Sequence, residues 1–188
     1  NIKEGESLLV LGAAGGVGLA AVELGKAMGA KVIAAASSEE KLQTCKEHGA
    51  DEILLYPSGN MDRDQQKKLS DDIKALTGGE GADVVYDPVG GDYAEPALRA
   101  TAWEGRYLVV GFAAGDIPKI PLNLALLKGC QIVGVFWGAF KGREVEAHNA
   151  NVDELLKLYG DGHLKPHISS IYSLEEGSKA ISDLAERK

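Results

Sequence analysis

The chain has 188 residues, of which 45% are hydrophobic and 26% are charged, and its formal net charge is −8 at pH 7. These proportions are typical of a globular domain with one substantial core and exclude a disordered chain. The negative charge argues against nucleic acid as the main partner, so local groups would have to hold any phosphate-bearing ligand.

The spacing of particular residues argues against other broad classes of protein. Cys45 and Cys130 lie far apart, and Pro166 interrupts the spacing between His163 and His167, so neither pair indicates a disulfide framework or a metal site. No apolar run reaches the length needed to cross a bilayer, and the first residues lack a signal-peptide pattern. We therefore expect no metal, no membrane contact and a reducing, cytoplasmic location.

Short apolar runs alternate with helical patterns along the chain, which is typical of a parallel sheet covered by helices. Apolar runs predict strands at residues 8–11, 31–36, 53–55, 83–86, 107–110 and 131–135, with a possible seventh at residues 167–172. Helical spacing predicts helices over residues 17–28 and 144–159, and another that follows a loop and ends near residue 76. Serine–glutamate pairs at residues 37–40 and 173–176 predict capping boxes. The fold expected is a Rossmann-type α/β domain over residues 1–188, a doubly wound parallel sheet with helices on both faces.

A glycine-rich turn stands between the first predicted strand and its helix. Residues 12–18 read Gly-Ala-Ala-Gly-Gly-Val-Gly, which matches the dinucleotide pattern Gly-x-Gly-x-x-Gly with Ala13 in the first glycine's place. The glycines let a backbone approach a pyrophosphate, and the helix start offers free N–H groups. We predict that Ala14, Gly15, Gly16 and Val17 bind the cofactor there. The alternative is a turn that only packs the helix on the strand, and the missing first glycine favours it.

The end of the second predicted strand distinguishes between dinucleotides. NAD sites place Asp or Glu there to bind ribose hydroxyls, whereas this chain has Ala36, followed by Ser37 and Ser38. Without a carboxylate to repel it, a 2′-phosphate can be bound by these hydroxyls and by the ammonium of Lys41. A helix cap at Ser38 and a solvated Lys41 are the alternatives, and the two glutamates between them would weaken the pocket. The pattern favours NADP(H).

These motifs together resemble the coenzyme domain of zinc-independent medium-chain dehydrogenases/reductases, in the quinone oxidoreductase branch. The resemblance extends over the whole chain, through residues 13–18, 37–41, 56, 86–91, 105–106, 110–113, 126–129, 134–138 and 162–166. Alanine in the first glycine place is usual in this branch, so Ala13 supports the resemblance.

The resemblance implies which residues would meet the cofactor. Ser37, Lys41 and Tyr56 would contact the adenosine 2′-phosphate. The ribose–nicotinamide end would be lined by residues that follow three later strands, namely Val89, Gly90, Gly111, Phe112, Ala113, Val135, Phe136 and Trp137. Ligands of open α/β sheets do lie outside the carboxyl ends of strands, although core or interface packing is the alternative for Phe136 and Trp137.

Members of this family are nearly twice as long and carry a barrel-like catalytic domain before the coenzyme domain. Because that domain is absent and the chain starts at Asn1 without Met, we expect an excised coenzyme-binding domain. The family also dimerises through an edge strand, for which residues 131–136 are the candidate; a homodimer is thus one expected partner.

The resemblance implies an NADPH-dependent enzyme that transfers hydride to a quinone or another conjugated carbonyl, such as an enone. Reduction of an enoyl-thioester or a related double bond is the alternative within this family. From a different class, the chain is a cofactor-binding module that is inactive by itself. We name no catalytic acid or base, because the cofactor carries the hydride and the protein orients it. Asp87, before Pro88 at a strand end, is better explained by structural hydrogen bonding.

Overall fold

The structure is a computed structural model that describes residues 2–186, and it contains one sheet of six parallel strands. The strands are β1 (Ser7–Leu11), β2 (Lys31–Ala36), β3 (Glu52–Leu55), β4 (Ala82–Asp87), β5 (Thr101–Val109) and β6 (Gln131–Gly134). The helices are α1 (Gly16–Ala27), α2 (Glu39–Glu47), α3 (Arg63–Leu76), α4 (Ala94–Arg99), α5 (Asn123–Lys128), α6 (Trp137–Arg143), α7 (Val145–Gly160) and α8 (Gly177–Ala185), with short 3-10 helices η1 (Gly91–Tyr93) and η2 (Leu174–Glu176).

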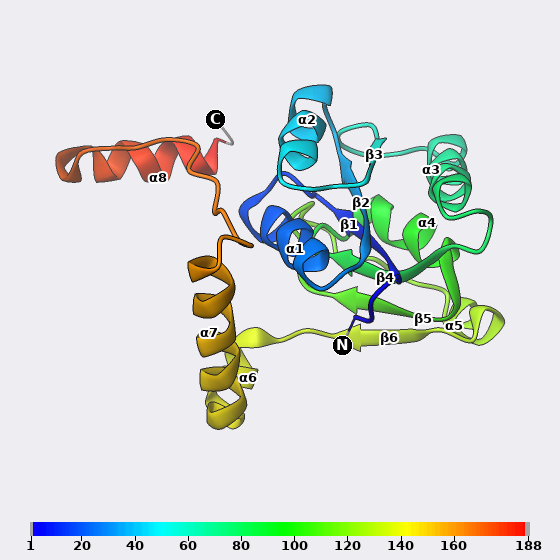
Figure 1. Cartoon of the computed structure of the whole chain (residues 1–188). Helices are drawn as coiled ribbons and strands as arrows, with labels where there is room; N and C mark the ends of the chain where they lie inside the picture. The colour runs from blue at the N-terminus through cyan, green and yellow to red at the C-terminus, as the bar shows by residue number, and fades with distance from the viewer. Residues whose placement is uncertain (1, 187–188) are drawn as a thin grey trace.

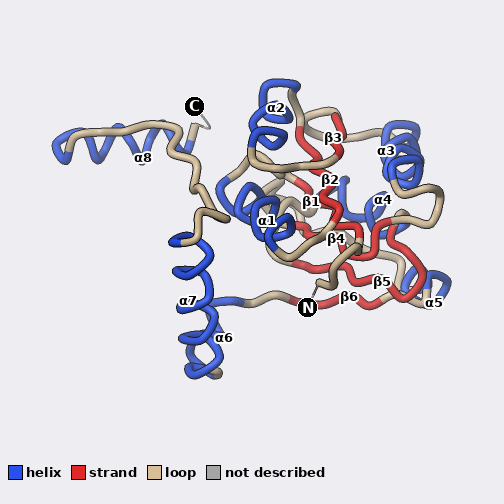
Figure 2. Tube along the Cα trace, in the orientation of Figure 1, coloured by secondary structure: helices blue, strands red, loops and turns tan. Residues whose placement is uncertain are grey.

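The strand order β3-β2-β1-β4-β5-β6 confirms the doubly wound Rossmann-type fold (Figures 1 and 2). The chain winds outward from β1 through β2 to β3, crosses back, and winds the other way from β4 to β6. In this order the direction of winding reverses between β1 and β4, which is where ligands of open α/β sheets bind.

Each face of the sheet has its own hydrophobic core. Leu8 and Val10 of β1 lie in the cluster that α1 and α2 cover, whereas Leu9 and Leu11 lie in the cluster beneath α3, α4 and α5. Successive residues of a strand point to opposite faces, so a strand covered on both sides needs apolar residues throughout. This explains why β1 is a continuous apolar run in the sequence.

The last quarter of the described chain, residues 135–186, leaves the sheet and is here named the C-terminal arm. It contains α6, α7 and α8, none of which has a buried residue, and in Figure 1 it lies to the left of the sheet. The arm touches the body where the backbone N–H of Lys165 donates to the Glu23 carboxylate, 3.2 Å away. Glu23 also pairs with His48, whose ring lies against that of His167.

Two local predictions were wrong. Residues 167–172 form no strand, because this segment runs through the arm with no strand beside it to complete a ladder. The cap of α2 is also shifted by one residue from the predicted pair, since Ser38 rather than Ser37 accepts the backbone N–H of Lys41. The predicted box at Ser173 and Glu176 is confirmed.

Strand β5 begins at Thr101, six residues before the predicted start, because Thr101 already pairs with Ala82, and the register of the two strands shifts after this pair. The extra residues include Glu104, whose φ of 58° is left-handed. Among residues 2–186, no helix combines the length and the apolar character that crossing a membrane requires.

Candidate cofactor-binding site

The predicted site residues all follow the carboxyl ends of strands. Because the six strands are parallel, these ends lie at one edge of the sheet. The groups are Ala14 to Val17 after β1, Ser37, Ser38 and Lys41 after β2, Tyr56 after β3, Val89 after β4, Gly111 to Ala113 after β5, and Phe136 and Trp137 after β6. The fold thus brings segments from the whole chain to one edge.

The glycine turn presses α1 closely against the end of β1. A Cβ atom on Gly18 would lie 2.3 Å from the Gly12 carbonyl oxygen, so only glycine fits there. Gly16, in contrast, has open space around its Cβ position, and Gly15 caps the helix without a side-chain bond. Because no side chain caps α1, its first N–H groups are free to bind phosphate oxygens.

The glycine turn lies close to neighbouring segments on both sides of β1. The N–H of Ala13 donates to the Ala35 carbonyl at 3.0 Å, which brings the turn beside the end of β2. On the other side, a Cβ on Gly12 would meet the side chain of Val89 at 2.8 Å. The turn therefore lies between the β2 end and the loop after β4.

The end of β2 carries no carboxylate. The strand ends at buried Ala36, and Ser37 and Ser38, which follow it, are half-buried. The Ser38 hydroxyl oxygen accepts the N–H of Lys41 at 3.4 Å, so Ser38 caps the N-terminus of α2. A hydroxyl that accepts one hydrogen bond can still donate another, so the cap leaves a donor for a ligand. The side chain of Lys41 is exposed.

Tyr56 lies beneath the glycine turn. Its hydroxyl accepts the N–H of Gly12 at 3.1 Å, its ring packs against Tyr93 at 4.7 Å between centroids, and only 7% of the residue is exposed. Burial raises the pKa of the Tyr56 hydroxyl to about 12, so the group stays protonated. Tyr56 thus holds the turn in shape, and its contact with a 2′-phosphate stays a prediction.

Asp87, at the end of β4, organises the next loop. One carboxylate oxygen accepts the N–H groups of Val89 and Gly90, both at 2.8 Å, and the other accepts the Tyr107 hydroxyl. Asp87 is 2% exposed, and these hydrogen bonds agree with the structural role predicted for it. Burial, and then the charge of Asp87, raise the pKa of Tyr107. Sequence reasoning missed Tyr107, because a partner twenty residues away in another strand leaves no local signal.

The loops after β4 and β5 lie against each other. The N–H of Gly111 donates to the Asp87 carbonyl at 3.2 Å, and that of Ala113 to the Pro88 carbonyl at 3.0 Å. Gly90 has a φ of 69°, and a Cβ there would meet the Phe112 ring at 2.9 Å. The structure therefore brings the predicted Val89 and Gly111 to Ala113 groups together.

Phe136 and Trp137 are exposed, so the alternative that they pack in the core is wrong. They are 79% and 59% exposed, and the ring of Trp137 has the Lys141 ammonium 4.9 Å from its centre and the His148 ring at its edge. Neither residue packs in the core, so both are available to a ligand or to another surface. Within residues 2–186, no three His, Cys, Asp or Glu side chains are grouped so that they could hold a metal ion.

Comparison with known proteins gives the family. A family model described as "Zinc-binding dehydrogenase" matches residues 16–155. A quinone oxidoreductase-like protein 2 homolog from Nematostella vectensis is 39% identical over 190 residues, covering 100% of this chain and 50% of that protein. An acryloyl-coenzyme A reductase from Sulfurisphaera tokodaii is 33% identical, covering 97% of this chain and 49% of that protein.

A solved structure from the same family has a similar fold. Escherichia coli quinone oxidoreductase complexed with NADPH superposes with a TM-score of 0.82 at 28% identity, covering 100% of this chain and 56% of that chain. The chain spans about half the length of the curated relatives it matches. It corresponds to their coenzyme-binding half, and it belongs to the medium-chain dehydrogenase/reductase family, in the quinone oxidoreductase-like branch.

Proposed function

We propose that this chain binds NADPH as the coenzyme domain of a reductase that transfers hydride to a quinone or another conjugated carbonyl. The observation that carries the proposal is the end of β2, where Ala36 replaces the acidic residue of NAD sites and Ser37, Ser38 and Lys41 follow. The NADPH bound by the similar Escherichia coli enzyme supports it.

The residues present fit such a cofactor. The open space at Gly16 and the free N–H groups of α1 suit a pyrophosphate, and the hydroxyls and ammonium after β2 suit a 2′-phosphate. The exposed rings of Phe112 and Phe136 suit the nicotinamide end. When bound, NADPH supplies the hydride, and the residues of this chain bind and orient it.

A melting experiment tests the cofactor. NADPH should raise the melting temperature more than NADH at equal concentration, and Lys41→Ala should narrow the difference because it removes a cation from the 2′-phosphate. Lys46→Ala, at an exposed lysine of the same helix, is the control and should leave the difference unchanged. Equal stabilisation by NADH would contradict the proposal.

The substrate is proposed for the whole protein, because the chain spans only half of its relatives. A quinone is favoured by the quinone oxidoreductase relatives, and an enoyl-thioester is the second candidate because one relative is an acryloyl-coenzyme A reductase. Turnover of menadione and of crotonyl-coenzyme A by the full-length protein would separate the two. If the protein reduced the thioester and not the quinone, the enoyl-thioester would become the first candidate substrate.

We further propose that a catalytic domain packs against the C-terminal arm. Large apolar side chains of the arm are exposed, among them Leu156 at 62%, Ile171 at 88% and Leu184 at 79%. Exposed apolar surface of this extent is typical of an interface, and the relatives have a further half of chain to cover it. The isolated chain should accordingly turn over quinone poorly, which a direct assay tests.

Strand β6 is the proposed dimer contact. It is the edge of the sheet, and its Ile132 and Val133 are 41% and 37% exposed, so an uncovered apolar edge can pair with a second copy. Val133→Lys should shift the sedimentation of the full-length protein from dimer to monomer.

A cytoplasmic location fits the free thiols of Cys45 and Cys130, and imaging of the tagged parent protein tests it.

A further inference from the structure

A groove on the face of the sheet covered by α3, α4 and α5 is separate from the cofactor edge. It encloses about 740 Å³, which lies within the range of small-molecule sites. It extends to Lys74 in the last turn of α3 and to Lys128 in the last turn of α5. These two helices end just before β4 and β6 begin, so this end of the groove lies toward the amino edge of the sheet, opposite the glycine turn.

The charge of the groove is opposite to that of the whole chain. Its lining has five cationic side chains and two carboxylates, whereas the chain carries a net charge of −8. The cations are Arg63, Lys67, Lys74, Arg99 and Lys128, and the carboxylates are Asp71 and Glu95. Both carboxylates are already paired, Asp71 with Lys67 at 2.8 Å and Glu95 with Arg99 at 2.6 Å.

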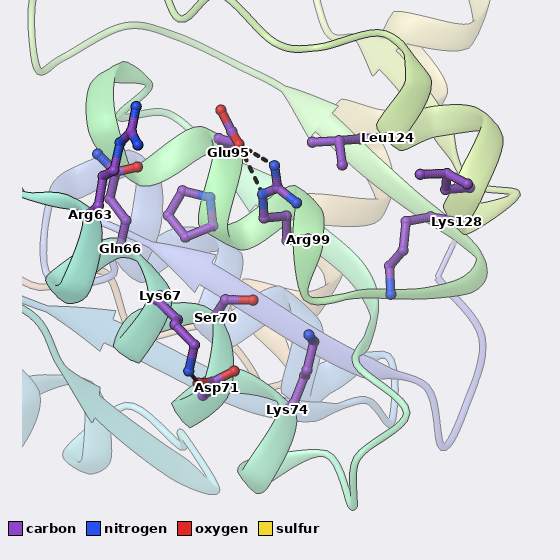
Figure 3. Close-up of a pocket in the computed structure, with 12 residues that line it drawn as sticks. Arg63, Gln66, Lys67, Ser70, Asp71, Lys74, Glu95, Arg99, Leu124 and Lys128 are labelled. Atoms are coloured by element: carbon purple, nitrogen blue, oxygen red, sulfur yellow. Dashed lines mark hydrogen bonds and ion pairs between the residues drawn. The ribbon is translucent and has the colours of Figure 1, made fainter.

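Three cations of the lining make no ion pair within residues 2–186, although the charge of Lys74 acts on Asp71 and helps to lower the pKa of that carboxyl. In the described part of the chain, no ion pair or hydrogen bond engages the side chains of Arg63, Lys74 or Lys128. Figure 3 shows Lys74 and Lys128 extending toward the same end of the groove from their two helices. Burial, together with the charge of Lys74, lowers the pKa of Lys128, so the two ammonium groups repel each other there. A bound anion would remove this repulsion.

A hydroxyl group stands beside these cations. Ser70 of α3 is only 5% exposed, and Figure 3 shows its hydroxyl pointing into the groove between α3 and α4. Within residues 2–186 this hydroxyl makes no hydrogen bond, so it can donate to a ligand. Buried Leu124 and exposed Leu127 line the same groove and offer apolar contact.

We propose that this groove binds a small metabolite through a phosphate or pyrophosphate group, held by Lys74, Lys128 and Ser70. Two ammonium groups and a hydroxyl match a dianionic oxyanion, since they supply charge-assisted hydrogen bonds to several oxygens. The leucines suit an apolar part of the same ligand. The site is distinct from the proposed NADPH site, which lies at the carboxyl edge of the sheet.

The test is a pyrophosphate titration of the ¹⁵N-labelled 188-residue chain, followed by NMR. Amide signals of residues 70–79 and 124–129 should shift together and saturate. Because pyrophosphate can also bind the glycine turn, the amides of residues 14–18 are followed in the same spectra. The two sites are therefore measured separately, and failure at one leaves the other readable.

A matched pair of double variants completes the experiment. Lys74→Glu with Lys128→Glu should weaken binding at the groove at least tenfold and leave the affinity at the glycine turn unchanged. The control, Lys46→Glu with Lys157→Glu, makes the same change of charge at exposed helix positions and should retain groove binding. Melting curves check that both variants fold. Shifts confined to residues 14–18, no saturable shift, or equal loss in both double variants would overturn the proposal.

Discussion

At the scale of single residues, the site depends on a few positions where only one residue type fits. Gly18 is the clearest, because a Cβ there would lie 2.3 Å from the Gly12 oxygen and 2.8 Å from the Cα of Ala13. Both neighbours are backbone atoms, which cannot rotate away. The sequence motif predicted this close packing, whereas the hydroxyl of Tyr56 beneath the turn could not be predicted, because its partner is a backbone group 44 residues away.

Gly18→Ala should therefore destabilise the chain by about 1–3 kcal/mol, the usual cost of an overpacked site. Gly16→Ala is the matched control, because open space surrounds that Cβ and alanine favours a helix start. Urea denaturation measures both. If the two variants unfolded at the same urea concentration, the close packing described for the turn would be wrong.

A second residue-scale prediction concerns pH. Arg106 donates hydrogen bonds to the Glu6 carboxylate at 2.9 and 2.5 Å, and this lowers the pKa of Glu6. A carboxyl with a lowered folded-state pKa contributes stability above its unfolded pKa of about 4.3, and that contribution is lost as the pH falls through the folded value. Glu6→Gln should flatten the fall in stability below about pH 5.

The pH dependence is measured as the free energy of unfolding in urea between pH 7 and pH 3. Glu4→Gln removes an exposed carboxylate and serves as the control. A wild-type slope in Glu6→Gln would show that the pair does not contribute.

At the scale of elements, apolar patterning predicted the strands well and the caps less well. Strand β2 matches its predicted bounds, because the five residues after Lys31 are all apolar and buried, as in a strand covered on both faces. A cap depends on one hydrogen bond, so the sequence left two candidates, Ser37 in the capping-box spacing and Ser38 as a plain cap, and the structure shows the second. The strand predicted at residues 167–172 fails for a different reason, since a strand needs a neighbour that local sequence does not reveal.

The capping box at the start of α3 should contribute measurably to stability. Asp62 accepts the N–H of Gln65 at 2.8 Å, and the Gln65 side chain accepts the N–H of Asp62 at 3.0 Å, which is a full capping box. Asp62→Ala should cost about 1 kcal/mol of stability. Asp64→Ala removes the same charge from the first turn without breaking the box, so it should cost less. Equal losses would mean that the charge, and not the cap, stabilises the helix.

At the scale of the whole molecule, the chain has two regions that differ in packing. In the described chain the buried residues all lie between Leu8 and Leu124, whereas α6, α7 and α8 contain none. The sequence predicted α7 almost to its ends, but its pattern could not reveal that the helix would lie off the sheet. Periodicity reports which residues are apolar and not what covers them.

This difference should appear in hydrogen exchange. Amides of α7 and α8 should exchange much faster than those of β1 and β4, because few buried contacts oppose local opening. The same amides should become protected in the full-length protein if a second domain covers the arm. Protection of α7 equal to that of β1 in the 188-residue chain would contradict the packing described.

The proposed selection of NADPH by the end of β2 can be measured by isothermal titration of the 188-residue chain with each cofactor. We expect NADPH to bind at least tenfold more tightly than NADH, and Lys41→Ala to lower this ratio by about fivefold, which corresponds to about 1 kcal/mol. Equal affinity for the two cofactors, or a ratio unchanged by Lys41→Ala and Ser37→Ala together, would contradict it.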